Sequence, residues 1–265
     1  MEIPDLPNLA ARIRLDVLEM IHAAGSGHPG GSLSAVEILV QLFFREMKAG
    51  ADRDRFILSK GHAAPALYAV MAARGMLPRS ELSSLRRLGS RLQGHPDMHR
   101  LPGLDSSTGS LGQGFAAAVG LARGLRLSGS SARVYCLLGD GELQEGAVWE
   151  AAAGAAHAGL GNIVAIVDCN GVQLDGPVDS IKRQKPASER WLAWGWHALD
   201  LDGHSFESLE EAFREARAVS MPVALCARTV KGRGVSFMEG SCAWHGRCPD
   251  ASELERARGE IGANP

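Results

Sequence analysis

The chain has 265 residues, of which 45% are hydrophobic, 22% are charged and 5% are aromatic, and its formal net charge is −2. This length suffices for a sizeable core, and the balanced charge argues against a surface that attracts nucleic acid. Aromatic residues are too few for the basic, aromatic surfaces on which bases stack. No stretch of sequence approaches a membrane span, so we expect neither nucleic acid nor a membrane among the partners.

The N-terminus and the cysteines indicate the cellular compartment. The first ten residues, MEIPDLPNLA, are acidic and lack the apolar core of a secretory signal. The five cysteines form no Cys-x-x-Cys pair, and two of them lie inside apolar runs. This usage is typical of buried, reduced thiols, so we expect a cytoplasmic protein.

Hydrophobic periodicity predicts helices and strands in alternation along the chain. The predicted helices are 8–24, 32–47 (capped by Ser32), 63–74, 80–88, 115–127, a small-residue helix beginning near Glu142, and 205–219. The predicted strands are 55–58, 134–138, 163–167, 197–201 and 222–229. This alternation is typical of an α/β protein with an open, mainly parallel twisted sheet and helices on both faces. We expect a single domain over residues 1–265.

Three further segments have predicted features. Residues 94–114 are poor in regular structure, and a loop this long inside a compact domain is usually functional. A polar segment, 178–189, precedes a tryptophan cluster that is expected to anchor the core or an interface, namely Trp191, Trp194 and Trp196. An irregular C-terminal extension is expected from about residue 230, with a short helix near 252–258.

Residues 134–176 carry the most informative pattern. Two apolar runs, each followed by a polar turn, flank the small-residue helix. This order predicts one βαβ unit whose strands are parallel neighbours. Asp140 follows the first run and Asn170 the second, so both lie at the carboxyl edge of the sheet, where ligands of open α/β sheets bind.

Oxygen atoms at this edge can hold a hard cation. The side chains of Asp140 and Asn170 and the carbonyl of Val172 supply three oxygen ligands, and diphosphate and water complete the shell around Mg²⁺ or Ca²⁺. Backbone N–H groups near Glu142 favour the phosphates. Asp-Gly and Asn-Gly are also ordinary turn formers. Their position at the ends of consecutive strands is what favours a metal site.

The sequence Gly139-Asp140-Gly141, followed by a helix and Asn170, resembles the thiamine diphosphate motif of transketolase-like enzymes, and GELQEG (141–146) narrows the resemblance to transketolases. Further matching stretches are Gly27-His28-Pro29-Gly30, Lys60-Gly61-His62-Ala63, Gly94-His95-Pro96-Asp97, TGSLGQG (108–114) and Trp244-His245-Gly246. The resemblance covers essentially the whole chain and implies the diphosphate-binding (PP-type) fold. It departs at Cys169, where many relatives have Asn or Asp, and at Ser110, where many have Pro.

The resemblance also implies residue roles. His62 would contact the diphosphate, whereas His28, His95 and His245 would line the ketose channel and bond its hydroxyls and oxyanion. Glu145 would support catalysis from a carboxylate network in the subunit interface. The implied cofactor-binding set is His62, Gly109, Ser110, Leu111, Gly139, Asp140, Gly141, Glu142 and Asn170, with the Gly109–Leu111 stretch on the aminopyrimidine ring.

Other histidines and one basic turn are less specific. An ordinary structural role is expected for the remaining histidines, namely His22, His99, His157, His197 and His204. The sequence Lys231-Gly232-Arg233-Gly234 resembles a phosphate clamp, but a solvated basic turn fits it equally well.

In transketolases the glutamate that activates the aminopyrimidine lies in a second domain, after the part matched here. The chain is therefore expected to be the N-terminal subunit of a split transketolase. A C-terminal subunit would carry the pyrimidine-binding and C-terminal domains, and the two would form an α2β2 heterotetramer. The implied cofactors are thiamine diphosphate and Mg²⁺ (or Ca²⁺). The implied reaction transfers a two-carbon ketol unit from a ketose or its phosphate to an aldose.

Other functions stay open at this stage. The chain could belong to an enzyme similar to deoxyxylulose phosphate synthase or to a specialised ketol transferase, although Gln144-Glu145-Gly146 favours a transketolase. It could also be a non-catalytic regulatory or partner subunit, but the retained Asp140 and Asn170 argue against this. A nucleotide-binding protein is not supported, because there is no Walker A pattern and the glycine-rich stretch 109–114 does not follow a strand.

Overall fold

The computed structural model describes residues 5–182 and 186–263. Within these residues the main sheet has five strands, all parallel, in the order β1-β2-β3-β7-β6. The strands are β1 (Arg55–Leu58), β2 (Val134–Gly139), β3 (Ile163–Cys169), β6 (His197–Asp202) and β7 (Val223–Arg228). The predicted parallel α/β sheet is confirmed, and β2 and β3 are neighbours, as the βαβ pattern requires.

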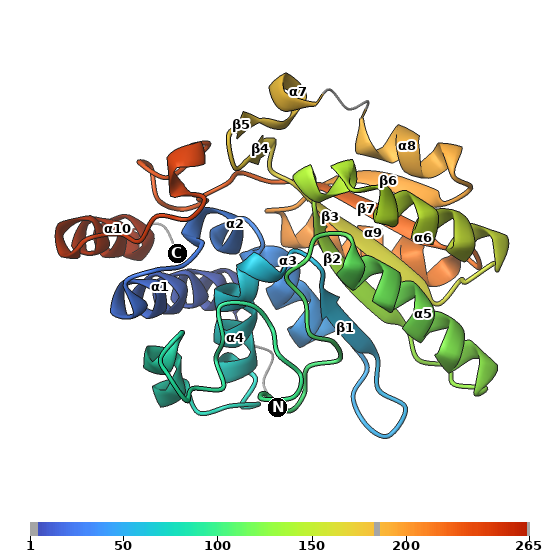
Figure 1. Cartoon of the computed structure of the whole chain (residues 1–265), viewed down its shortest axis with the longest axis horizontal. Helices are drawn as coiled ribbons and strands as arrows, with labels where there is room; N and C mark the ends of the chain where they lie inside the picture. Colours follow the sequence, from blue (N-terminus) through green and yellow to red (C-terminus); the bar gives the residue numbers. More distant parts are fainter. Residues whose placement is uncertain (1–4, 183–185, 264–265) are drawn as a thin grey trace.

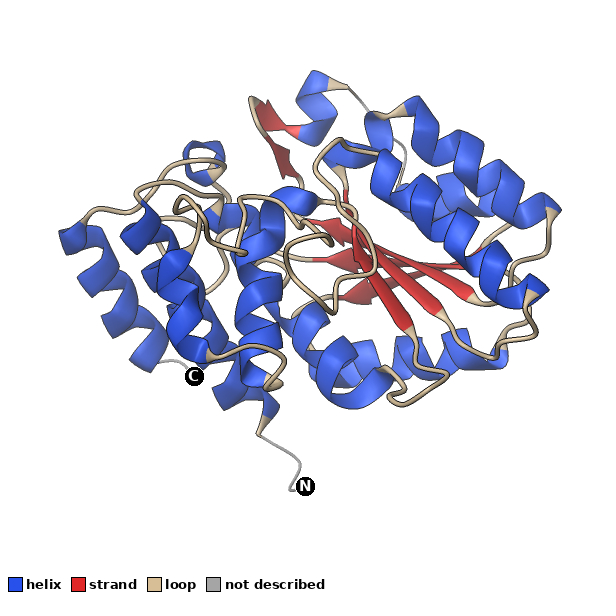
Figure 2. Cartoon of the chain, turned by 60° about the horizontal axis from the view of Figure 1, so that its bottom comes forward, coloured by secondary structure: helices blue, strands red, loops and turns tan. Residues whose placement is uncertain are grey.

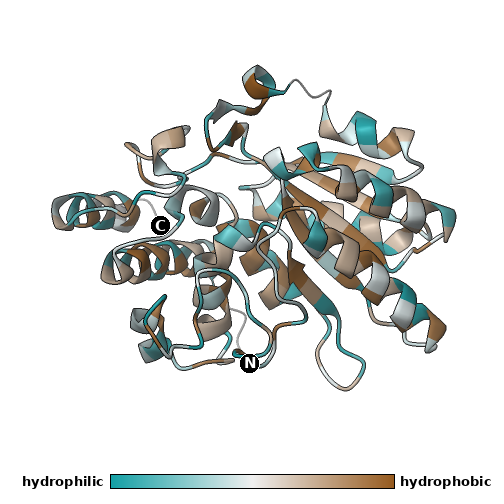
Figure 3. Ribbon diagram, viewed as in Figure 1, coloured by the Kyte–Doolittle hydropathy of each residue, from teal (hydrophilic) through white to brown (hydrophobic). Residues whose placement is uncertain are grey.

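Helices cover both faces of the sheet (Figures 1 and 2). One face packs against α5 (Gln113–Leu127), α6 (Gly146–His157) and α8 (Ala187–Ala193). On the other face α9 (Phe206–Ala218) contacts β6, and the residues of this face share one hydrophobic cluster with α1 (Leu6–Ala24), α3 (Val36–Gln41) and α4 (Ala64–Ala73). The strands are apolar on both faces, as a sheet covered on both sides requires, and they form the hydrophobic centre in Figure 3.

The helix predicted over 32–47 is wrong in its start and in its continuity. It is divided into α2 (Pro29–Leu33), α3 and a π-helical turn, η1 (Leu42–Glu46). Helix α2 begins at Pro29 because proline suits the first helical position, where no N–H donor is needed. Ser32 therefore lies inside the helix, where its Oγ donates to the carbonyl of His28 at 2.7 Å. As a result His28, and not Ser32, is the N-cap residue of the helix.

The helix predicted to begin near Glu142 also starts later. A 3-10 turn, η4 (Gly141–Gln144), follows β2, and α6 begins at Gly146 with Glu145 as its N-cap residue. The Glu142 carboxylate accepts from the backbone N–H of Gly139 at 3.1 Å, so the chain folds back into a tight turn before the helix. Glu145 then has an extended backbone, which separates the turn from the helix.

The C-terminal extension is more regular than expected. Its helix, α10 (Ala251–Ala263), is longer than the predicted 252–258 and buries Leu254, Ala257 and Ile261 against the helical core. The smaller elements are η2 (Gly61–Ala63), η3 (Arg79–Ser84), β4 (Val172–Gln173), β5 (Gly176–Pro177), α7 (Val178–Ile181) and η5 (Cys242–Trp244). The predicted polar segment 178–189 includes residues 183–185, which lie outside the described residues.

Two of the three tryptophans lie in the core, as expected, and the third is exposed. Trp191 and Trp196 are buried beside Phe115, and their ring centroids lie 4.7 Å apart. Trp194 is exposed and stacks on Trp149. The five cysteines are free thiols. Among the helices of residues 5–182 and 186–263, none has both the length and the apolar composition of a membrane-spanning helix.

A substitution of Gly161, which lies in the turn before β3, tests how tightly this turn packs. A Cβ atom at Gly161 would lie 2.3 Å from the carbonyl oxygen of Ser220, so Gly161→Ala must displace backbone. We expect it to destabilise the chain by about 1–3 kcal/mol in urea unfolding. Gly259→Ala is the matched control, because Gly259 in α10 has open space around it and alanine favours helix. Equal effects of the two substitutions would contradict this packing.

Candidate functional site

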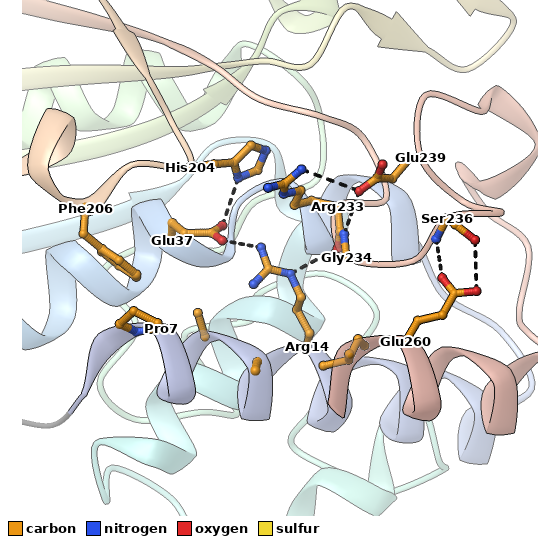
Figure 4. A pocket seen from close by; sticks show the side chains of 13 residues that line it. Pro7, Arg14, Glu37, His204, Phe206, Arg233, Gly234, Ser236, Glu239 and Glu260 are labelled. Atoms are coloured by element: carbon orange, nitrogen blue, oxygen red, sulfur yellow. Dashed lines mark hydrogen bonds and ion pairs between the residues drawn. The ribbon is translucent and has the colours of Figure 1, made fainter. Parts of the chain in front are cut away.

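A cavity of about 360 Å³ lies at the carboxyl edge of the sheet, where β1, β2 and β3 end. It is lined by the polar residues that follow these strands and by loops from distant parts of the chain. A larger cavity, of about 760 Å³, lies elsewhere (Figure 4). The charged groups of that larger cavity pair mostly with one another, so the smaller cavity is the better candidate for chemistry.

Four histidines from four separate segments meet in this cavity. The ring centroid of His28 lies 5.6 Å from that of His62, 6.0 Å from that of His95 and 5.5 Å from that of His245. The rings of His62 and His245 are 5.3 Å apart. The four histidines singled out from the sequence thus form one cluster, although the first and the last of them are more than 200 positions apart in the chain.

These imidazoles are held in the neutral form. Burial and the charge of Arg86 lower the pKa of His28 to about 4, and burial and the charge of Lys231 lower that of His245 to about 4. The pKa of His62 is well below its ordinary value, chiefly because of burial and then because of Lys60. Neutral imidazoles can both accept and donate a proton, which suits them to bind hydroxyl groups.

The predicted metal ligands lie side by side. Asp140 accepts hydrogen bonds from the backbone N–H groups of Gly141 at 2.8 Å and Gly171 at 2.6 Å, so its carboxylate adjoins the Asn170 turn. The Nδ2 of Asn170 donates to Asp168 at 3.1 Å, which fixes the orientation of its amide. Burial and the charge of Asp168 raise the pKa of Asp140 to about 6. A cation at this position would favour the ionised carboxylate.

Asp168 and Lys60 form a buried ion pair to which the sequence analysis assigned no role. Asp168 is fully buried and accepts from the Lys60 ammonium, from Ser34 Oγ at 2.6 Å and from the Thr229 hydroxyl. Lys60 also donates to the carbonyl of Gly31 at 2.9 Å. The sequence held a signal for Lys60, because only Ser59 separates it from an apolar strand.

Glu142 joins three loops of the cavity. Its Oε1 accepts from Ser59 Oγ at 2.5 Å and from the backbone N–H of Gly112 at 2.8 Å, while its Oε2 accepts from Gly139 N–H at 3.1 Å. Burial raises the pKa of this carboxyl group. The side chain lines the cavity, but its oxygens are engaged with the protein, so its contribution is to hold the loops together.

Two further basic residues complete the surroundings. Lys231 is 2% exposed and its Nζ lies 3.0 Å from the carbonyl of Val172 and 2.9 Å from Nδ1 of His245. Lys231 is therefore not part of a solvated turn. Arg86 Nη2 lies 3.4 Å from Nδ1 of His28, and Arg86 has a φ of 58°, which is rare for a residue other than glycine. No motif in the sequence indicated Arg86.

Comparison with known proteins fits this geometry. The family model described as "Transketolase, thiamine diphosphate binding domain" matches residues 7–265. The chain belongs to the transketolase family. A 6-deoxy-6-sulfo-D-fructose transketolase subunit of Clostridium sp. (strain MSTE9) is 43% identical over 91% of this chain and 90% of that protein. An apulose-4-phosphate transketolase subunit of Phocaeicola vulgatus is 35% identical over 98% of this chain and 95% of that protein.

Longer transketolases match over part of their length. Human transketolase is 46% identical over 91% of this chain, which spans 40% of that protein. The crystal structure of Campylobacter jejuni transketolase superimposes with a TM-score of 0.90 at 32% identity, over 99% of this chain and 43% of the other. The chain thus corresponds to the thiamine diphosphate-binding part of these transketolases.

The remaining predicted site residues fall at the cavity and its rim. Gly109 and Leu111 line it, and a Cβ atom on Gly109 would lie 3.2 Å from the His95 ring, so this transketolase loop requires glycine there. Glu145 is exposed at the rim. Ser110, in contrast, is exposed and does not line the cavity.

Replacing Glu142 tests its role as the link between the loops. In Glu142→Gln the amide NH₂ faces a backbone N–H, so one buried donor loses its partner. We expect a loss of about 1–3 kcal/mol of unfolding free energy, measured by urea denaturation. The matched control is Glu150→Gln, because Glu150 is exposed on α6, in the same segment between β2 and β3. An unchanged stability of Glu142→Gln would contradict the proposed link.

The histidine cluster predicts how stability depends on pH. His28 and His245 have folded-state pKa values of about 4, below the ordinary 6.5, so the unfolded chain binds more protons between these values. The contribution of these two histidines to the unfolding free energy is therefore fully present above pH 6.5 and is lost as the pH falls toward 4. Urea titrations at several pH values should show a shallower decrease for His28→Gln. The exposed His99→Gln should decrease as steeply as the original chain.

Proposed function

We propose that this chain is the diphosphate- and metal-binding subunit of a two-component transketolase. The observation that carries the proposal is the convergence of four neutral histidines with Asp140, Asn170 and Val172 in one cavity at the carboxyl edge. Histidines suit the hydroxyl groups of a sugar, and oxygen ligands suit a hard cation. The family match supports thiamine diphosphate as the cofactor.

The donor set fits a magnesium diphosphate. Asp140 offers a carboxylate, and Asn170 and Val172 offer neutral oxygens, which are ligand types that Mg²⁺ or Ca²⁺ prefers. Lys231 and Lys60 both line the cavity, and Lys231 has its ammonium 3.0 Å from the Val172 carbonyl. Cationic groups next to a cation site are unfavourable alone, so their presence favours an anionic ligand that carries several negative charges.

Each group of residues has a distinct task in this proposal. Thiamine diphosphate supplies an electron sink for cleavage of the ketose carbon–carbon bond. His28, His95 and His245 bind the ketose hydroxyls and stabilise the oxyanion, and as neutral imidazoles they can transfer protons near neutral pH. His62 would contact the diphosphate when the cofactor is bound. Asp168 orients Asn170 by accepting from its Nδ2. The amide oxygen of Asn170 accepts from the backbone N–H of Val172 at 3.2 Å and would use its second lone pair for the metal.

A second polypeptide completes the proposed enzyme. The support comes from two relatives whose names call them transketolase subunits and of which this chain covers 90% and 95%. The partner would carry the pyrimidine-binding and C-terminal domains and the activating glutamate, in a cytoplasmic α2β2 complex. Glu145 at the exposed rim is suitably placed for that interface. The reaction transfers a two-carbon ketol unit between a ketose, or its phosphate, and an aldose.

The metal assignment is tested in the assembled complex. Asp140→Ala and Asn170→Ala each remove an oxygen ligand, so we expect Mg²⁺-dependent binding of thiamine diphosphate to be lost in calorimetric titration. Glu207→Ala, an exposed carboxylate of α9, is the control and should bind normally. Undiminished affinity of the two site variants would remove the metal assignment. Turnover of a ketose by this chain alone would remove the need for a partner.

A further inference from the structure

A single loop, residues 229–234, contributes side chains to both cavities described above. Lys231 faces the histidine cavity, whereas Arg233 and Gly234 line the larger cavity of about 760 Å³. The basic motif identified in the sequence is thus divided between two sites. Figure 4 shows the second of these, with Arg233 beside the side chains that hold the loop from that side.

Two side chains, Arg14 and His204, hold the loop from the side of the larger cavity, and a third, Glu37, joins them. Glu37 of α3 accepts from Arg14 Nη2 at 2.5 Å and contacts Nδ1 of His204 at 3.1 Å. Arg14, in α1, also donates from Nε to the carbonyl of Arg233 at 3.1 Å. We call Arg14, Glu37 and His204 the buried triad, because their side chains are 8%, 9% and 11% exposed.

The hydrogen bonds determine the state of the His204 ring. The backbone N–H of Val230 donates to Nε2 of His204 at 2.8 Å, so Nε2 carries the lone pair. Nδ1 therefore carries the proton and donates to Glu37. Glu37 thus stabilises the tautomer protonated on Nδ1, and this tautomer leaves Nε2 free to accept from the backbone N–H of Val230.

The triad holds the part of the loop that carries Lys231. Val230 immediately precedes Lys231, and Arg233 follows two residues later. Both flanking backbone groups are bonded to triad side chains. On the opposite side, the Lys231 ammonium reaches Val172 and His245. Glu239 also contacts the loop, because it accepts from Gly234 N–H at 3.0 Å and lies 3.8 Å from Arg233.

We infer that the buried triad positions Lys231 in the histidine cavity by fixing the loop backbone on both sides of it. His204 is therefore a positioning residue, and its expected role as an ordinary structural histidine is extended by this inference. The inference rests on the proposed function for the consequence that an anionic ligand binds less well when Lys231 is displaced. The displacement itself is independent of any ligand.

Two substitutions of His204 separate its two bonds. His204→Asn keeps a donor near the Nδ1 position for Glu37 but has no acceptor at the Nε2 position. His204→Gln places its amide oxygen near the Nε2 position, where it can accept from Val230 N–H. We therefore expect His204→Asn to release the loop and His204→Gln to retain it in large part. His197→Asn is the matched control, because His197 also contacts a glutamate, Glu215, at 2.8 Å, but on the surface.

The measurements are made on the full chain without ligand. In His204→Asn, amide exchange at Val230 should be about tenfold faster, as expected for the loss of one hydrogen bond. Acetylation of Lys231 by acetic anhydride, followed by peptide mass spectrometry, should also be about tenfold faster because the side chain leaves its buried position. The equally buried Lys60 is the internal reference and should react at its original rate. His197→Asn should change neither rate.

The outcomes test the inference about the loop and the proposed function separately. Unchanged exchange at Val230 in His204→Asn would overturn the inference, and so would faster exchange with unchanged acetylation of Lys231. Faster acetylation of Lys60 as well would show general unfolding and equally reject a positioning role. Titration with pyrophosphate and Mg²⁺ then examines the proposed function, where His204→Asn should bind about tenfold more weakly. A chain that binds no pyrophosphate would contradict the proposed anion site and leave the loop result standing.

Discussion

The fully buried carboxylate of Asp168 is the group on which the cofactor cavity depends. It receives donors from four segments, namely Lys60 after β1, Ser34 before α3, Asn170 after β3 and Thr229 after β7. Burial opposes its ionisation, but the Lys60 charge and these hydrogen bonds hold its pKa below the ordinary value. A buried ion pair contributes little net stability, yet removing one partner costs about 3–5 kcal/mol because the other charge remains. The pair therefore enforces one arrangement of the four segments.

A second buried carboxylate acts in the same way on the other side of the cavity. Glu142 connects the loops that contain Ser59, Gly112 and Gly139. The two carboxylates together hold several loops of the cavity in place, and in that cavity the His28 ring lies within about 6 Å of the other three histidine rings. Preorganised groups of this kind do not have to reorient during a reaction, which is where most catalytic stabilisation by polar groups originates.

The electrostatic character of the cavity follows from this arrangement. Lys60, Lys231 and Arg86 surround histidines whose own protonation is suppressed, so the cationic groups are fixed and the imidazoles remain free to exchange protons. The larger cavity has the opposite organisation, because Arg14 and Arg233 there already have glutamate partners. The loop 229–234 connects the two environments mechanically.

The sequence by itself determined the parallel α/β class, the strand ends at Asp140 and Asn170, and the histidines of the cavity. These features depend on local periodicity and on residues that directly follow strands or glycines, and both are visible in linear order. The start of α2 at Pro29, the turn before α6, the exposed position of Ser110 and the roles of Arg86 and Asp168 were decided only by the tertiary structure. Each depends on a partner far away in the chain or on a backbone conformation that competing contacts select. Similarly, His204 has no neighbouring motif, and only the fold brings Glu37 and Val230 to the two sides of its ring.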